Sequence, residues 1–184
     1  MHVAGTVVSA GAAFSRPTAS EHAAFYSPYI ARVPDGDVLD HLARQIDDTR
    51  RALRDLPAER SGHGYAPDKW SVTEVVGHLA DAERVFAYRA LRFARGDATP
   101  LPGFDETVYT PAGEFDRRPM AALVDEFGVV RAATLALFRG LPADAATRTG
   151  VANGQPISVR ALAWIIAGHE LHHRAVLRER YGVG

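Results

Sequence analysis

The residues of this sequence best suited to chemistry are histidines near its C-terminal end. Three of its eight histidines fall within residues 169–173. A helix turns by about 100° per residue, so His169 and His173 would lie one turn apart on a face that also carries apolar, core-directed residues. His172 would lie toward the flank and is a weaker ligand candidate. Two buried imidazoles side by side predict a divalent metal ion, which would satisfy both lone pairs.

A third ligand is expected from a different segment of the chain. His78 borders the apolar stripe of another expected helix, and the preceding Gly77 would let a neighbouring backbone approach closely. With His169 and His173 it would form a three-nitrogen site inside a helical bundle, with positions left open to water or substrate. The chain has no Cys, so a metal would be held by nitrogen and oxygen ligands only. One zinc, nickel or other first-row divalent ion is the expected cofactor.

The same histidines also fit a competing pattern. Residues 169–173 read H-E-x-x-H, in which Glu170 would be the general base of a zinc peptidase. A peptidase needs a third metal ligand downstream. The extended motif requires Gly where this sequence has Val176 and His where it has Glu179. Neither residue fits, and no strands are expected for a peptidase cleft. The three-histidine site is therefore favoured over the peptidase.

Four long amphipathic segments must position these side chains. Each is bounded by capping residues, as in the capping-box pair Ser71 and Glu74. The expected helices start after Asp37 and end before Pro57, start after Ser71 and close at Gly96, run from Pro119 to Gly140, and start after Ser158 and stop at Gly182. No convincing strand pair is seen, and residues 96–118 are expected as a long, functional loop. The sequence predicts an all-α fold, an antiparallel four-helix bundle with long loops between helices.

Length and composition limit the remaining choices. A chain of 184 residues suits one domain, expected as a partly irregular N-terminal arm over 1–36 and the bundle over 37–184. The formal net charge of -1 argues against nucleic acid and anionic membranes as partners, and no apolar run is long enough for a membrane span. The N-terminus lacks the charged start of a signal peptide, and the absence of Cys suits a cytoplasmic location.

Two runs of residues resemble a known family. WSVTEVVGHL at residues 70–79 and AGHELHHR at residues 167–174 are similar to motifs of the DinB/YfiT-like superfamily, and the resemblance spans about residues 37–181. It implies an antiparallel four-helix bundle with a divalent metal held by three histidines. Carried over to this sequence, the metal ligands are His78, His169 and His173.

The resemblance implies a site more than a reaction. Relatives include bacillithiol S-transferases and a mycothiol-dependent maleylpyruvate isomerase, so a thiol S-transferase or a small-molecule hydrolase is expected. The alternative is a stress-associated metal-binding protein without catalysis. The expected partners are a small-molecule substrate, a low-molecular-weight thiol and a second copy of the chain in a homodimer.

Further residues are candidates for supporting roles. Glu170 could orient a ligand or take a proton, although a charged residue at its helical angle is more often solvated, and Arg174 could meet an anionic substrate. We take these two as the candidate catalytic residues. Aromatic residues expected either to wall a pocket or simply to pack are Trp70, Trp164, Phe104 and Tyr109. Residues 102–106 are a candidate lid.

Overall fold

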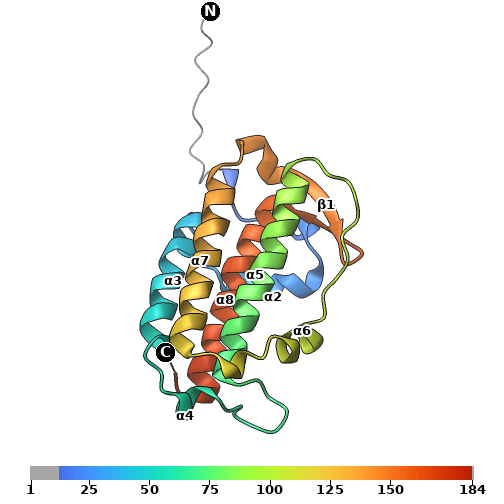
Figure 1. The fold of residues 1–184 in the computed structure, drawn as a ribbon. Coiled ribbons are helices and arrows are strands. Elements are labelled where there is room, and N and C mark those ends of the chain that lie inside the picture. Colours follow the sequence, from blue (N-terminus) through green and yellow to red (C-terminus); the bar gives the residue numbers. More distant parts are fainter. Residues whose placement is uncertain (1–12, 184) are drawn as a thin grey trace, which may run out of the picture.

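The computed structural model describes residues 13–183. Within them, four long helices form the predicted four-helix bundle, which is confirmed (Figure 1). These helices are α3 (Val38–Leu53), α5 (Val72–Ala94), α7 (Met120–Arg139) and α8 (Val159–Tyr181). Large apolar side chains of these helices, such as Trp164 and Phe138, are fully buried in the core.

The four helices form a ring in which each one contacts two neighbours. Helix α5 packs against α7 and α8, and α3 packs against the same two helices. Side-chain contacts show that α5 and α8 run in opposite directions, because Trp70 and Tyr181 meet at one end and residues 78 and 169 meet further along. Helices α5 and α7 run in the same direction, so this neighbouring pair is parallel rather than antiparallel as expected, and the long crossover between them makes this possible (Figure 1). This arrangement places the middle of α8 beside the first half of α5.

The helices begin and end at the residues that local chemistry predicts. The side chains of Asp37 and Ser158 accept backbone N–H bonds at the starts of α3 and α8, and Ser71 and Glu74 form the expected capping box. Gly96 and Gly182 follow the ends of α5 and α8 with φ of 76° and 64°. Two helix boundaries differ from the expected ones. Helix α3 ends at Leu53, some residues before Pro57, and the short α4 (Ala58–Ser61) follows it. Pro119 is the N-cap residue of α7 rather than its first helical residue.

The expectation that the chain has no strand pair is wrong. Strands β1 (Thr149–Ala152) and β2 (Gln155–Ser158) form an antiparallel hairpin. Asn153 and Gly154 both have positive φ, as a tight hairpin turn requires. Strands of four residues are too short to show a clear alternation, and the Asn-Gly pair was the available signal. A short 3-10 helix, η4 (Ala143–Thr147), precedes the hairpin.

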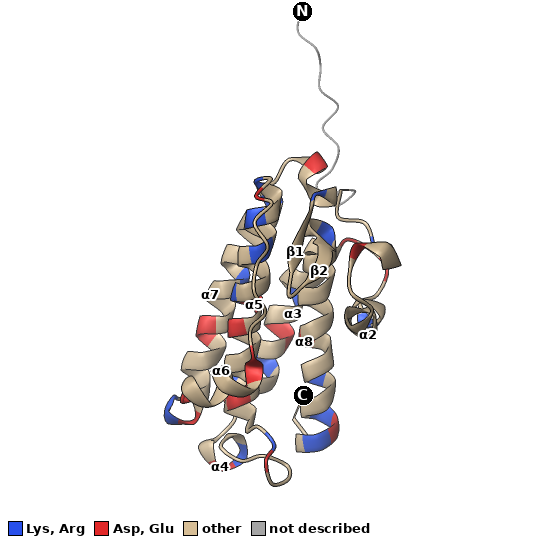
Figure 2. Ribbon diagram, turned by 90° about the vertical axis from the view of Figure 1, so that its right-hand side faces the viewer, with Lys and Arg blue, Asp and Glu red and all other residues tan. Residues whose placement is uncertain are grey.

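The long crossover also contains regular structure. It includes α6 (Glu106–Ala112) and the 3-10 helix η3 (Phe115–Arg117), both packed against α5. Leu101 bridges to Ala152 at the hairpin. In Figure 2, α6 and the hairpin lie on the side of the bundle that faces the viewer, and the hairpin contacts both α5 and α8. Residues 96–118 therefore form a wall along this side.

Part of the N-terminal segment packs on the bundle. Residues 1–12 lie outside the described residues, but η1 (Ala19–Glu21), η2 (Ala24–Tyr26) and α2 (Ser27–Arg32) are ordered elements, and α2 contacts α8. Gly168 makes this contact possible, because a Cβ there would lie 2.0 Å from the Tyr29 carbonyl oxygen. The expected domain boundary at residues 36 and 37 stays a prediction.

Charged residues of both signs are spread along the helices in Figure 2, in keeping with the small net charge. Among the described residues, no helix combines the length and apolar character that crossing a bilayer would need.

Candidate metal centre

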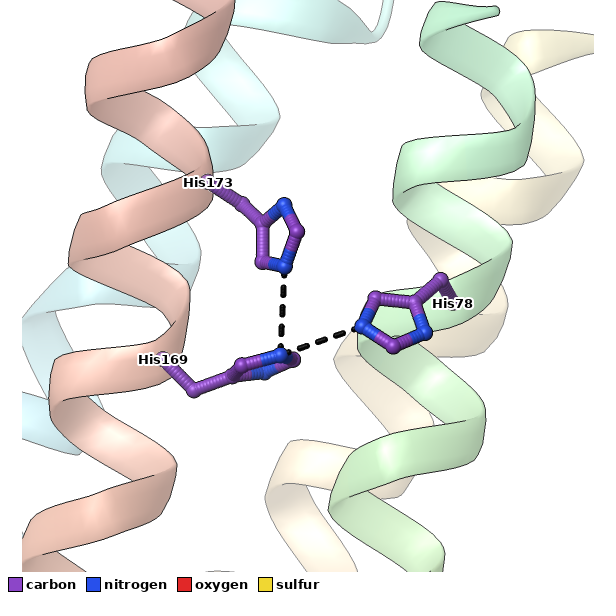
Figure 3. A group of neighbouring side chains, drawn as sticks. All are labelled: His78, His169 and His173. Atoms are coloured by element: carbon purple, nitrogen blue, oxygen red, sulfur yellow. Dashed lines mark hydrogen bonds between the residues drawn. The ribbon is translucent and has the colours of Figure 1, made fainter. Parts of the chain in front are cut away.

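Three imidazoles meet in the space between α5 and α8. His78 projects from α5, and His169 and His173 project toward it from successive turns of α8 (Figure 3). The Nε2 atom of His169 lies 3.1 Å from the Nε2 of His78 and 3.1 Å from the Nε2 of His173. His78 and His169 are buried and His173 is partly buried. The structure thus brings together the three residues that the sequence singles out.

Hydrogen bonding alone does not satisfy this cluster. A neutral imidazole nitrogen either carries one proton or offers one lone pair. The Nε2 of His169 has two nitrogen neighbours at equal distance, so it can form a good hydrogen bond with only one of them. Nitrogen ligands that surround one ion at about 2.0 to 2.1 Å must themselves lie only a few ångströms apart, as these do. The donor set therefore fits a divalent metal ion.

The protonation of the three side chains also suits metal binding. Burial lowers the pKa of His78 to about 4. Burial, reinforced by the neighbouring imidazoles, lowers the pKa values of His169 and His173 well below the usual value. The reference pKa of His is about 6.5, so all three are neutral at pH 7 and keep a lone pair for a metal. This is the protonation state in which imidazole is a ligand.

The cluster opens onto a cavity of about 340 Å³. Helix α5, helix α8, the crossover and the N-terminal segment all contribute to its wall, which is largely aromatic. The lining residues are Phe25, Tyr26, Tyr29, Trp70, His78, Ala82, Phe86, Arg89, Gly103, Phe104, Glu106, Asn153, His169, His172 and His173. A small molecule can therefore reach the three imidazoles.

Two of the four candidate wall aromatics line this cavity. Trp70 packs on His78 with ring centroids 4.8 Å apart, and Phe104 comes from the candidate lid segment. Tyr109 contacts Phe104 but is half exposed, and Trp164 is a core residue whose indole N–H donates to Phe14. Residues 102–106 thus form part of the wall.

The sequence reasoning missed the aromatic residues that the N-terminal segment supplies. Phe25, Tyr26 and Tyr29 line the cavity, and the Tyr29 ring packs edge-on against His169. The available signal was the cluster of three aromatics within five residues, together with Gly168 beside His169.

Gly77 has a different role from the one expected. A Cβ at this position would lie 2.3 Å from the ring of Phe115, so the glycine admits a side chain of the crossover rather than a neighbouring backbone. The crossover is thereby held against α5 one residue away from His78.

Glu170 points away from the three imidazoles and is not solvated. Its carboxylate accepts hydrogen bonds from the hydroxyl of Thr49 at 2.5 Å and from the guanidinium of Arg131 at 2.8 Å. Arg131 is fully buried and also binds both carboxylate oxygens of Glu83. Burial alone would lower the pKa of Arg131, but the charges of Glu170 and Glu83 raise it above the usual range. The geometry of an H-E-x-x-H peptidase is therefore not formed, and a catalytic role for Glu170 stays a prediction.

Arg174 and His172 also lie apart from the cluster. Arg174 pairs with Asp48 of α3 at 3.2 Å and lines a separate hollow of about 460 Å³ between α3 and α8. His172 reaches the rim of the histidine cavity and packs against Tyr29, but it is outside the group of three ligand atoms. The catalytic role expected for Arg174 also stays a prediction.

Comparisons with known proteins agree with this arrangement. The model of the DinB superfamily matches residues 41–177. The structure is similar to YfiT from Bacillus subtilis, described as a probable metal-dependent hydrolase with an unusual four-helix bundle topology, with a TM-score of 0.66 and 18% identity over 90% of this chain and 93% of that one. It is also similar to a mycothiol-dependent maleylpyruvate isomerase, with a TM-score of 0.63 and 15% identity over 79% of this chain and 61% of that one. No curated protein matches the sequence. At these identities the two structures support the fold.

Proposed function

Since this chain belongs to the DinB superfamily, we propose that it is a metal-dependent enzyme acting on a small molecule in the histidine cavity. The reaction proposed is transfer of a bacillithiol-type thiol to an electrophile, or hydrolysis. The observation that carries the proposal is the set of three Nε2 atoms, from His78, His169 and His173, at the wall of an open cavity of about 340 Å³.

The number of ligands favours catalysis over a structural metal. Structural zinc sites are usually closed by four protein ligands, whereas catalytic sites use three and leave a position open. Within residues 13–183 the cluster contains three ligand atoms, and the cavity adjoins them. A divalent ion held here would lower the pKa of a thiol or a water molecule and so supply a nucleophile at neutral pH.

The protein's own residues would bind the substrate and limit its contact with water. Trp70, Phe86 and Phe104 offer apolar surfaces in the cavity wall, so an apolar group would be desolvated beside the imidazoles. The chain has no Cys, so the thiol of a transfer reaction would arrive as a cosubstrate. One similar structure is described as a probable metal-dependent hydrolase and the other as a mycothiol-dependent isomerase. Both hydrolysis and thiol transfer therefore stay in the proposal.

The test is a turnover assay on protein purified without a His-tag or a nickel column. Its metal content is measured first, and bacillithiol is then offered with a haloalkane or an epoxide, alongside a series of esters and amides. We expect a reaction with the metal-loaded protein and none with His173→Ala, while His172→Ala, the matched control one residue away, keeps its metal. Bound metal without any turnover would instead support the non-catalytic, stress-associated metal-binding protein.

Three further expectations accompany the proposal. A cytoplasmic location rests on the absence of Cys, and the homodimer and a role in stress rest on the family resemblance alone. Each stays a prediction.

A further inference from the structure

A second chemical group of the cavity wall is unaccounted for by metal binding. Arg89 extends from α5 and is only 3% exposed, yet it lines the histidine cavity. One guanidinium nitrogen donates to the carbonyl oxygen of Pro102 at 2.9 Å, and the group lies near the rings of Phe86 and Phe104. The phenol of Tyr26 also faces it, and burial raises the pKa of that phenol, so Tyr26 is neutral. These four neighbours of the Arg89 guanidinium are all uncharged.

The charge of Arg89 has no ion-pair partner in the part of the chain that the structure describes. Among residues 13–183, no carboxylate forms an ion pair with it, although other arginines on the same helix, such as Arg84 and Arg92, do form ion pairs. The one acidic residue that lines the same cavity, Glu106, lies exposed at its edge. Buried charges are normally paired, because removing an ion from water is costly. A buried, unpaired guanidinium in an open cavity is therefore suited to a ligand that carries the missing negative charge.

The position of Arg89 relates this charge to the candidate metal centre. The Phe86 ring lies 6.0 Å from the ring of His169 and 5.8 Å from the guanidinium carbon of Arg89. The Phe86 ring therefore lies next to both polar groups, the imidazole of His169 and the guanidinium of Arg89. A molecule with an apolar body can contact Phe86 and reach the imidazoles and Arg89 at the same time.

We propose that Arg89 binds the carboxylate of the substrate, so that the substrate class is small organic acids with an apolar body. The proposal rests on the function proposed above. A planar guanidinium matches the two oxygens of a carboxylate, and the single charge of Arg89 balances a single negative charge. Glu106 at the edge of the cavity opposes a group with two negative charges, which favours a carboxylate over a phosphate monoester.

The experiment is a calorimetric titration of the zinc-loaded full chain with three probes: benzoate, its neutral analogue benzamide, and phenyl phosphate. We expect benzoate to bind at least about tenfold more tightly than benzamide, and phenyl phosphate to bind more weakly than benzoate. Arg89→Gln should reduce the benzoate-to-benzamide ratio by about tenfold or more, and Arg89→Lys should retain part of it. Arg92→Gln, which removes a surface arginine of the same helix, should leave the ratio unchanged.

Several outcomes would overturn the assignment. An unchanged ratio in Arg89→Gln would mean that another group attracts the carboxylate. Equal weakening of benzoate and benzamide would mean that Arg89 only holds the loop at Pro102, and tighter binding of phenyl phosphate would exclude the carboxylate. Melting curves of Arg89→Gln and Arg89→Lys show whether each variant is folded. If Arg89→Gln does not fold, the benzoate-to-benzamide ratio is measured on Arg89→Lys instead. The titration needs no turnover, so failure of zinc to bind contradicts the proposed function separately from the result for Arg89.

Discussion

Two buried arginines of this bundle have opposite surroundings. Arg131 of α7 donates to the carboxylates of Glu83 and Glu170 and to the Leu42 carbonyl oxygen in a region closed to solvent, and Thr49 donates to Glu170. Arg89 of α5 lies in the wall of the histidine cavity with neutral neighbours. The side-chain polar atoms of the Arg131 cluster find hydrogen-bond partners within the protein, whereas the cavity presents imidazole lone pairs and a guanidinium without an ion-pair partner. The Arg131 region is suited to holding α3, α5, α7 and α8 together, and the cavity is suited to binding a metal ion and an anionic ligand.

The largest effect that this comparison predicts concerns the free energy of unfolding. Arg131→Met would leave two carboxylates buried without a cation, which should lower that free energy by about 3–5 kcal/mol. Arg89→Met loses one hydrogen bond but also removes an unpaired buried charge, so its effect should be below about 1 kcal/mol. Urea unfolding of the metal-free variants measures both. Equal destabilisation by the two substitutions would remove the distinction drawn here.

The next effect concerns metal binding by the open region. Loss of a residue that only supports a ligand typically reduces metal affinity by about 10- to 100-fold, so His169→Ala, which removes a ligand atom, should cost on the order of 100-fold or more. Elemental analysis after dialysis should find little metal in His78→Ala, His169→Ala and His173→Ala. His172→Ala should retain it, and metal retained by the triple variant would refute the site.

A third prediction concerns how the stability of the metal-free protein depends on pH through the open region. The pKa of His78 is lowered to about 4, so between pH 6.5 and 4 the unfolded chain binds a proton at this residue that the folded chain does not. Stability of the metal-free protein should therefore fall as the pH falls through this window, by up to about 3 kcal/mol from His78 alone. In His78→Gln the fall should be smaller. Denaturant unfolding at pH 7, 5.5 and 4.5 checks this, and an identical pH profile for the variant would contradict the burial of a neutral imidazole.

The smallest predicted effect lies within the closed region. Thr49→Val removes the hydroxyl that donates to Glu170 and leaves the carboxylate bound to Arg131 only, which should cost about 1.5 kcal/mol. Metal content should not change, because the hydroxyl faces away from the imidazoles. Loss of metal in this variant would show that the two regions are coupled through α8.

The sequence alone determined those features that depend on interactions within a few residues. The starts of α3, α5 and α8 were predicted because a cap involves a side chain and a backbone N–H two or three residues away. His169 and His173 were recognisable as a pair because residues four apart share a helix face. His78 was selected as their partner by its place beside an apolar stripe, and the structure brings the three together.

The tertiary structure decided which helix faces meet, and this fixed the surroundings of each charged residue. Glu170 follows His169 directly, yet one residue of helical rotation turns it toward Thr49 and Arg131 of two other helices. Arg89 is buried because the tertiary structure places Pro102 of the crossover, 13 residues further along the chain, against it. Whether a charge is solvated, paired or left for a ligand depends on segments distant in the chain, because burial and pairing are set by packing and not by local spacing.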